Sequence, residues 1–167
     1  TARALQNGWL HTGDIGEFDS AGRLKITDRK KDIIVNDKGD NVSPQKVEGM
    51  LTLQEEIAQA MVSGDKRPYL VGVLVPEADW LGSWAKAQGK DGASLAQLTH
   101  DPGLHSALRG AVDRVNAELS VTEKVRQFII ADEPFSIENQ MLTPSIKIRR
   151  HMIRGAYQER LDALYKG

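Results

Sequence analysis

Apolar and polar residues alternate over short stretches in the first part of the chain. Residues 8–35 hold several short apolar runs separated by turn residues, and Leu24 and Ile26 alternate with basic residues. Such alternation is typical of half-buried strands joined by tight turns. The pattern predicts two or three short antiparallel strands. A β-branched run at residues 33–35 and a loop over residues 36–40, where Asn, Asp and Gly favour turns, are expected to follow.

The rest of the chain mixes helical spacing with short strand-like runs. Ser43 and Pro44 are typical of an N-cap and the first residue of a helix. Two β-branched runs separated by turn residues predict a hairpin, and apolar residues three or four apart predict amphipathic helices. After the first helix we expect, in order, strands at 57–62 and 69–75, a helix at 78–87, a loop at 88–103, a helix at 104–119, a strand at 125–131, a loop at 136–144 and, after residues 146–150, a final helix with apolar residues from 153 to 164.

This order predicts an α+β fold in which small antiparallel sheets pack with helices. Strands and helices do not alternate strictly, as they would in a doubly wound fold. The 167 residues are about the size of one domain. Leu, Ile, Val and Phe make up about a quarter of the chain and the formal net charge is -1, which excludes a disordered chain.

Composition excludes several classes of site and partner. The chain has no Cys, which excludes disulfides, thiolate metal sites and cysteine nucleophiles. Its 4 His residues show no metal-ligand spacing. An isoelectric point near 6.4 argues against a nucleic-acid partner. No apolar stretch reaches the roughly 18 residues of a membrane span and no signal sequence opens the chain, so we expect a cytoplasmic protein.

Basic residues nevertheless gather in two places. Residues 23–38 carry more basic than acidic side chains, and residues 143–154 carry Lys and Arg with no acidic residue. The two clusters could converge on one polyphosphate, because guanidinium forks match phosphate oxygens and Lys acts as a point charge. The alternative is that each cluster is a solvated surface.

Several short motifs follow one another at a specific spacing. They are GWLHTGD at residues 8–14, GRLKI at 22–26, DRKKD at 28–32, GDNVSP at 39–44 continuing to VE at 47–48, and MLTP at 141–144 followed by KIRR at 147–150. In this order they resemble the late motifs of the adenylate-forming superfamily, which includes acyl-CoA synthetases, peptide-synthetase adenylation domains and beetle luciferases. The Leu-Thr-Pro form of the last motif looks most like long-chain fatty acyl-CoA synthetases. The resemblance covers essentially the whole chain.

Members of this superfamily begin with a large domain that carries a phosphate-binding loop and an acyl pocket. Nothing in the chain matches that loop, and the chain begins at Thr1 without Met. The resemblance therefore implies that residues 1–30 are the end of the large N-terminal domain. Residues 31–167 would be the C-terminal lid domain, with its hinge at Lys31. The missing N-terminal adenylation domain would be the partner of this chain, and a fragment of this kind is expected to be inactive alone.

The resemblance also implies a reaction in two halves. A fatty acid carboxylate attacks the α-phosphate of ATP to give acyl-AMP and pyrophosphate, and the thiol of coenzyme A then takes the acyl group. ATP and coenzyme A would be co-substrates, and Mg²⁺ is implied only through ATP, with no metal ligand assigned to this chain. Membrane association of the whole enzyme is compatible with the resemblance but is not encoded here.

Two residues match the superfamily's nucleotide-binding positions. Asp14 matches the aspartate that accepts hydrogen bonds from the ribose hydroxyls, since an ionised carboxylate accepts several hydrogen bonds. Arg29 matches an arginine that reaches the ribose or the phosphates. The alternatives are a turn Asp that caps its own backbone and an Arg on a surface strand.

Two lysines match positions that change between the half-reactions. Lys31 falls at the hinge, where a long charged side chain stays solvated in both conformations. Lys147 matches the catalytic lysine that bridges the attacking carboxylate and the α-phosphate. The alternatives are one more Lys in a basic run and a Lys beside arginines at a helix start. Many superfamily members have Gly before the catalytic lysine; Ile146 stands here, and the long-chain branch often lacks that Gly too.

A third group of residues matches the coenzyme A site. Gly39 and Asp40 match the loop that lines the pantetheine tunnel after the lid rotates, where Gly allows close backbone approach. A simple turn between strand and helix is the alternative. Glu48 also fits the motif. The alternative is a structural role, in which a Glu near the N-terminus of a helix interacts favourably with the helix dipole. Trp80 and Trp84 are interpreted as packing residues.

The leading hypothesis is the C-terminal domain of an ATP-dependent long-chain fatty acid CoA ligase. A second hypothesis is a stand-alone binding or regulatory module that resembles such a lid. A third keeps the adenylating enzyme but changes the acid or the acceptor, for example to a carrier-protein pantetheine or to a luciferin-like oxidation.

Overall fold

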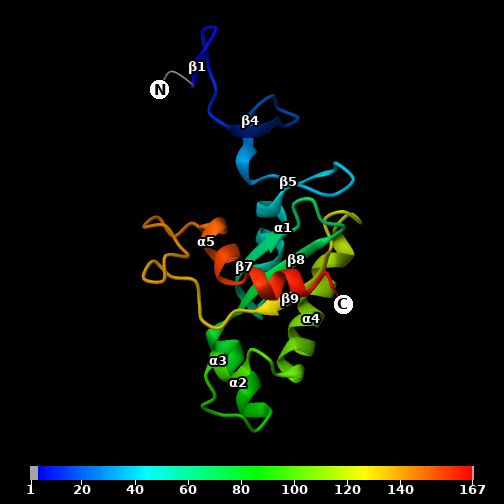
Figure 1. Ribbon diagram of the computed structural model, residues 1–167, viewed down its shortest axis with the longest axis vertical. Coiled ribbons are helices and arrows are strands. Elements are labelled where there is room, and N and C mark those ends of the chain that lie inside the picture. Colours follow the sequence, from blue (N-terminus) through cyan, green and yellow to red (C-terminus); the bar gives the residue numbers. More distant parts are fainter. Residues whose placement is uncertain (1–3, 167) are drawn as a thin grey trace.

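The computed structural model describes residues 4–166, apart from the side chains of Thr27 and Asp28. A slender N-terminal part made of short hairpins stands at one end of the long axis (Figure 1). Helices and the main sheet form a broader body that continues from it. None of the helices in this described range is both long and apolar enough to cross a membrane.

The N-terminal part consists of two antiparallel hairpins, which confirms short antiparallel strands there and adds a strand at residues 5–6 that was not predicted. They are built by β1 (Leu5–Gln6) with β2 (Trp9–Leu10) and by β3 (Asp14–Phe18) with β4 (Leu24–Arg29). Gly8 and Gly22 lie in their turns at φ 84° and 76°, a left-handed conformation that Gly adopts without steric cost. Large apolar side chains stay exposed here, Trp9 at 76% and Phe18 at 75%. Leu24 and Ile26 of β4 are likewise 60% and 55% exposed.

A three-stranded sheet forms the centre of the body. Strand β8 (Leu70–Pro76) is buried along its whole length between β7 (Ile57–Ser63) and β9 (Val125–Ile130). β7 and β8 form the expected antiparallel hairpin, whereas β9 runs parallel to β8. The α+β class is confirmed, but this sheet is mixed instead of purely antiparallel. The long helical connection between β8 and β9 brings the chain back to the end of the sheet where β8 began.

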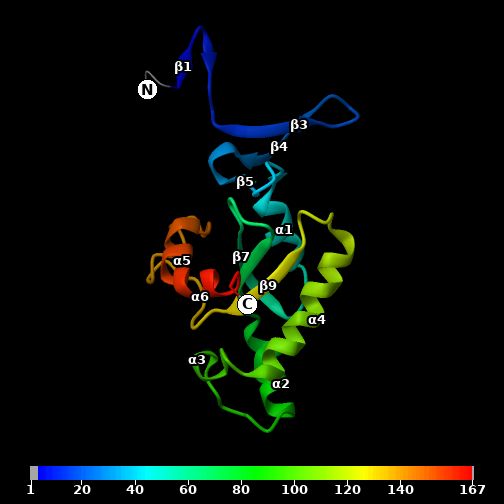
Figure 2. The same ribbon diagram turned by 45° about the vertical axis from the view of Figure 1, so that its right-hand side comes forward.

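Helices cover both faces of this sheet (Figure 2). α1 (Pro44–Leu51) and α4 (Pro102–Glu118) pack on one face, and α5 (Arg150–Ala156) and α6 (Gln158–Ala163) pack on the other. Alternate residues of β8 serve the two cores, because successive side chains of a strand point to opposite faces. Leu70 and Leu74 belong to the first core, and Val71 and Val73 belong to the second.

The remaining helices extend the first core. α2 (Ala78–Ala87) places Trp80 and Trp84 partly buried against it, which confirms their role in packing. The segment expected to be a loop at 88–103 contains the short helix α3 (Leu95–Leu98), so that expectation was wrong in part. A capping box joins Ser94 and Gln97 at its start, and the buried Leu98 anchors it, which stabilises a single helical turn.

The short elements between the hairpins and the body form the connection. The 3-10 turn η1 (Lys30–Asp32) leads into β5 (Ile34–Val35), which pairs with β6 (Asn41–Val42). At the other end of the chain, the predicted final helix is divided between α5 and α6. The division falls at Tyr157, whose ring is buried and whose hydroxyl accepts a hydrogen bond from the Asp132 backbone N–H at 3.0 Å.

Side chains of α4 cover the outer edge of β9. The amide of Asn116 bonds both backbone groups of Val125 at 2.9 Å. His105 stacks on the Phe128 ring, with centroids 4.2 Å apart, and its Nε2 lies 3.3 Å from the Phe128 carbonyl oxygen. These contacts satisfy backbone groups that an open edge strand would present to other chains.

Stability is expected to fall as His105 becomes protonated. Burial lowers the pKa of His105 from its ordinary value of 6.5, and the nearby Arg109 guanidinium lowers it further. As the pH falls below 6.5, His105 of the unfolded chain therefore takes up a proton before His105 of the folded chain does. The free energy of unfolding decreases over this pH range because the unfolded state binds more protons. Urea unfolding from about pH 7 to about pH 5 should show this slope, and His105→Gln should reduce it. An identical slope in both proteins would contradict the assignment.

Candidate functional site

A cleft of about 1030 Å³ lies where the second hairpin meets the body. Four of the residues predicted from the sequence line it: Asp14, Arg29, Lys31 and Lys147. They come from β3, β4, η1 and the segment before α5, so distant parts of the chain meet here. The sequence left open whether the two basic clusters converge or form separate solvated surfaces, and the structure places members of both on one cleft.

Asp14 and Arg29 face each other across the second hairpin. They are paired residues in the register of β3 and β4, and Arg29 Nε lies 2.7 Å from Asp14 Oδ1. The Asp14 backbone N–H donates to the Thr12 hydroxyl at 3.2 Å, so the turn is capped by Thr12 and the carboxylate is left to the cleft. The Asp14 side chain is 22% exposed, which restricts its orientation but leaves it accessible. A carboxylate has further acceptor positions beyond the one that Arg29 occupies.

Lys31 lies in the middle of η1, the turn that connects the hairpins to the body. Its backbone stands between extended residues on both sides, since Arg29 has φ -99° and ψ 131° and Ile33 has φ -59° and ψ 130°. Short 3-10 segments have weaker hydrogen-bond geometry than α-helices and are frequent connectors. The position suits a hinge, and the hinge role of Lys31 stays a prediction.

Lys147 lies in a tight turn that we call the lysine turn, residues 143–148. The Ile146 N–H donates to the Thr143 carbonyl at 2.8 Å, and the Thr143 N–H donates to the Lys147 carbonyl at 2.8 Å. The Thr143 hydroxyl accepts from the Lys147 N–H at 3.1 Å. Lys147 is exposed on this turn, so the alternative of a Lys at the helix start is wrong: α5 begins only at Arg150.

Ile146 adopts an unusual backbone conformation in the lysine turn. Its φ of 60° lies in the left-handed region, which β-branched residues rarely occupy, and its side chain is 73% exposed. The pattern matches a three-residue hairpin loop, in which the residue after the turn is left-handed and usually Gly. A Gly at this position would adopt the same conformation without steric cost.

Ile146→Gly is expected to stabilise the 167-residue chain slightly. A strained non-Gly residue costs of the order of 1–3 kcal/mol, and the greater flexibility of Gly in the unfolded chain offsets part of the gain. The free energy of unfolding should rise by about 0.5–1 kcal/mol in urea titrations. Ser145→Gly, next to it but without a positive φ, serves as the control and should not stabilise the chain. A loss of stability in Ile146→Gly would show that the Ile side chain contributes more than its strain removes.

Glu48 and Arg150 form a buried ion pair in the wall of the cleft, with side chains 10% and 18% exposed. Arg150 Nη2 donates to Glu48 Oε2 at 3.0 Å, and Nη1 donates to Oε1. Val62 of β7 joins them, because its N–H donates to Glu48 Oε1 at 2.8 Å and its carbonyl accepts from Arg150 Nη1 at 3.1 Å. Burial raises the pKa of Glu48 above its ordinary value, against the opposing effect of Arg150.

The explanation of Glu48 by the helix dipole is therefore wrong. Glu48 lies beyond the first turn of α1, which contains no acidic residue, and its carboxylate points to Val62 and Arg150. Sequence reasoning missed the pair because its members are 102 residues apart. The clue was a Glu on the same helical face as the apolar residues Val47 and Leu51.

Gly39 and Asp40 do not line the cleft. Gly39 has φ 88° in the loop between β5 and β6, and Asn36 organises that loop. The Asn36 side-chain carbonyl accepts from the backbone N–H groups of Lys38 at 3.0 Å and Asp40 at 2.8 Å. The structure thus separates the predicted coenzyme A loop from the predicted nucleotide site, and the role of the loop stays a prediction.

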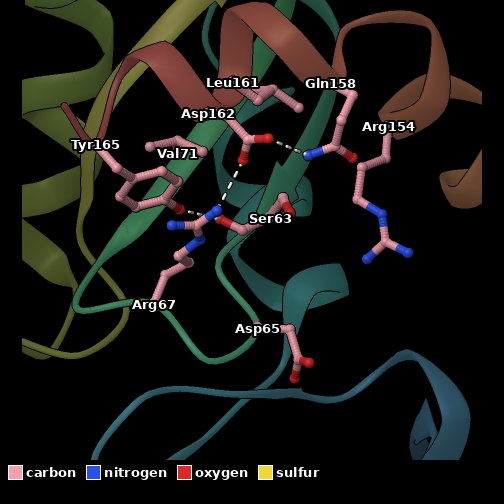
Figure 3. Close-up of a pocket in the computed structure, with 9 residues that line it drawn as sticks. All are labelled: Ser63, Asp65, Arg67, Val71, Arg154, Gln158, Leu161, Asp162 and Tyr165. Atoms are coloured by element: carbon pink, nitrogen blue, oxygen red, sulfur yellow. Dashed lines mark hydrogen bonds and ion pairs between the residues drawn. The ribbon is translucent and has the colours of Figure 1, made fainter.

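A second, smaller cavity of about 230 Å³ lies between the turn after β7 and α6 (Figure 3). Two of its charged groups form an ion pair, because Arg67 Nη2 lies 2.8 Å from Asp162 Oδ1. A third, Asp65, accepts from the Val35 backbone N–H through Oδ1 at 3.2 Å. The Arg67 carbonyl accepts from the Asp37 N–H at 3.1 Å. These contacts fix the loop between β5 and β6 to the body.

Acidic residues in the large cleft do not form a metal centre. Among the side chains that the structure describes, no group of three or more His, Asp or Glu residues could hold a metal ion. The remaining lining groups are mainly basic, among them Arg149, His151 and Arg154. The cleft is therefore suited to an anion with several charges, such as a nucleotide phosphate.

Comparison with known proteins gives a consistent result. A family model described as the AMP-binding enzyme C-terminal domain matches residues 31–167. Long-chain-fatty-acid--CoA ligase 1 of Cavia porcellus is 37% identical over 169 residues, which cover 99% of this chain and 24% of that protein. Long-chain-fatty-acid--CoA ligase FadD15 of Mycobacterium tuberculosis is 34% identical over 166 residues, which cover 99% of this chain and 28% of that protein. The chain thus spans about a quarter of the length of these relatives.

Solved structures match the whole chain. The adenylation domain of a carboxylate reductase from Mycobacterium chelonae superposes with a TM-score of 0.83 at 29% identity, covering 100% of this chain and 25% of that one. The A-PCP didomain of a carboxylic acid reductase from Segniliparus rugosus, in complex with AMP, superposes with a TM-score of 0.80 at 30% identity. That match covers 99% of this chain and 22% of the other.

Proposed function

Because the chain belongs to the family of AMP-binding enzyme C-terminal domains, we propose that it is the C-terminal part of an ATP-dependent long-chain fatty acid CoA ligase. In this proposal residues 31–167 form the mobile lid and residues 1–30 end the N-terminal adenylation domain. The observation that carries the proposal is the shared cleft: Asp14, Arg29 and Lys147 line it together. The similarity to long-chain-fatty-acid--CoA ligases supports the choice of substrate class.

Lys147 is the catalytic residue of the first half-reaction. A carboxylate oxygen of the fatty acid forms a bond to the α-phosphorus of ATP, and the bond from that phosphorus to the pyrophosphate oxygen breaks. Both reactants are anions, so a cation between them reduces the repulsion that grows toward the transition state. The exposure of Lys147 on a tight turn supports this role, because its ammonium group extends from a fixed backbone.

Asp14 and Arg29 position the nucleotide. The Asp14 carboxylate accepts hydrogen bonds from the ribose hydroxyls, while Arg29 holds the carboxylate in place and contributes positive charge near the phosphates. Mg²⁺ accompanies ATP through its phosphate oxygens and is not assigned to residues of this chain. These roles agree with the pairing of β3 and β4, which places Asp14 and Arg29 side by side at the cleft.

The second half-reaction requires the lid to turn about Lys31. In the present arrangement Lys147 faces the same cleft as Asp14, which corresponds to the first half-reaction. Rotation about η1 would withdraw Lys147 and bring in the loop with Gly39 and Asp40. Coenzyme A would then reach the acyl-adenylate along that loop, where Gly leaves space for a thin ligand.

The N-terminal adenylation domain is the partner that covers the hairpins. Trp9, Phe18 and Leu24 are 76%, 75% and 60% exposed, an unusual density of large apolar side chains at a surface. The chain matches only 24% of the length of the Cavia porcellus ligase, so the rest of such a protein is long enough to contain this domain. The 167 residues alone are expected to show no turnover, because the acyl pocket and the phosphate-binding loop would lie in the partner.

A carrier-protein pantetheine is the second candidate acceptor. The match to an A-PCP didomain at a TM-score of 0.80 favours it over a luciferin-like oxidation. The experiment supplies the full-length protein with ATP, a panel of fatty acids and either coenzyme A or a pantetheine-loaded carrier protein, and identifies the products. Long-chain acyl-CoA as the main product supports the proposal. Transfer of the acyl group only to the carrier protein would show that coenzyme A is not the acceptor. If no long-chain acid is adenylated, the proposal of a long-chain fatty acid CoA ligase is refuted.

A further inference from the structure

The Glu48–Arg150 pair connects the two segments that the half-reactions use in turn. Glu48 belongs to α1, which follows the loop with Gly39, and Arg150 is the first residue of α5, separated from the lysine turn only by Arg149. Both side chains also bond Val62 of the central sheet. The pair therefore fixes both segments to one rigid body.

The start of α5 depends on this pair for its anchoring. The N-cap residue Arg149 makes no side-chain hydrogen bond to the backbone of α5, so the first turn of this helix lacks the usual capping contact. The Arg150 guanidinium instead forms a fork to Glu48 and a bond to the Val62 carbonyl. Such a fork fixes direction as well as distance, because two parallel donors meet two acceptors.

We propose that Glu48 is a positioning residue: acting through Arg150, it sets the orientation of the lysine turn so that Lys147 enters the nucleotide site correctly. This inference rests on the proposed function of Lys147. Stability alone does not account for the pair, because well-packed apolar residues often stabilise a buried site as well as an ion pair does. A directional contact three residues from the catalytic lysine gives this charged pair a role that apolar packing would not fill.

The test is Glu48→Gln in the full-length protein, followed through each half-reaction. Gln keeps the size of the side chain and can still accept from the Val62 N–H, but its amide group opposes the donors of Arg150. Adenylation at saturating ATP and fatty acid should slow about tenfold with little change in KM, since small misplacements of reacting groups reduce kcat. Thioester formation from preformed acyl-adenylate should stay within about twofold of wild type.

Two further variants separate positioning from folding. Arg150→Lys keeps the charge beside Glu48 but loses the fork, so it should show an intermediate loss of adenylation. Lys46→Met is the matched control, because it removes a more exposed ion pair, at 2.7 Å to Glu123, from the same helix. It should leave both half-reactions unchanged. Hydrogen exchange in the 167-residue chain should show faster exchange of the Lys147 and Arg149 amides in Glu48→Gln than in Lys46→Met.

The outcomes are distinguishable. Wild-type adenylation in Glu48→Gln, with adenylation lost in Lys147→Ala, would overturn the positioning role while the proposed function stands. Equal loss of both half-reactions, matched by a lower melting temperature, would reduce the pair to a structural role. If Lys147→Ala has no effect, the proposed function fails, and unchanged hydrogen exchange in the lysine turn would overturn the positioning role independently.

Discussion

Lys147→Ala in the full-length protein is expected to slow acyl-adenylate formation by about 10²–10³-fold, the loss typical of removing one group that stabilises transition-state charge. The physical reason is the approach of two anions, the fatty acid carboxylate and the α-phosphate. Arg29 remains in the cleft of this variant, but it is held by Asp14. Pyrophosphate release, followed in rapid-mixing experiments, measures this step.

A matched control guards against a general loss of positive charge. Lys86→Ala removes an exposed Lys from the last turn of α2, outside the cleft. It should adenylate at the wild-type rate. Similar losses in the two variants would mean that the effect is electrostatic steering by the whole surface, and a wild-type rate in Lys147→Ala would mean that the basic cluster is a solvated surface.

Phe128→Ala is expected to reduce the free energy of unfolding of the 167-residue chain by about 3–5 kcal/mol. Phe128 lies on β9 with 1% of its surface exposed, and the His105 ring and the Arg109 guanidinium, 4.7 Å from the ring centroid, cover it. Removing the ring leaves a cavity that the parallel strand pair with β8 cannot close without breaking its register. Urea or guanidinium unfolding followed by circular dichroism measures the change.

Leu53→Ala is the control for this substitution. Leu53 is 82% exposed, so its removal should change the free energy of unfolding by less than about 0.5 kcal/mol. A loss in Phe128→Ala of no more than this amount would contradict the assignment of Phe128 to the core between the sheet and α4.

Local patterns predicted most of the fold. The N-cap at Ser43, the hairpin of β7 and β8 and the long helix α4 are all set by residues close in sequence. The parallel pairing of β9 was not predicted, because it depends on how a long connection returns to the sheet. The division of the last helix was also missed; it falls at Tyr157, which makes a tertiary contact with Asp132 that no local pattern reveals.

The residues of the candidate site were predictable where they belong to a sequence motif. Asp14, Arg29, Lys31 and Lys147 were all named from the sequence, and the structure brings them to one cleft. Periodicity did not reveal what joins them to the fold. The contact between Glu48 and Arg150 depends on three elements that meet only in the folded chain, so no local signal specifies it.

The most direct test of the central claim uses Lys147→Ala in the second half-reaction. Preformed long-chain acyl-adenylate is added to the full-length variant with coenzyme A, and thioester formation is followed. If Lys147 acts only in adenylation and leaves the site when the lid turns about Lys31, the variant should form thioester within about twofold of the wild-type rate. A loss of thioester formation as large as the loss of adenylation would contradict the account.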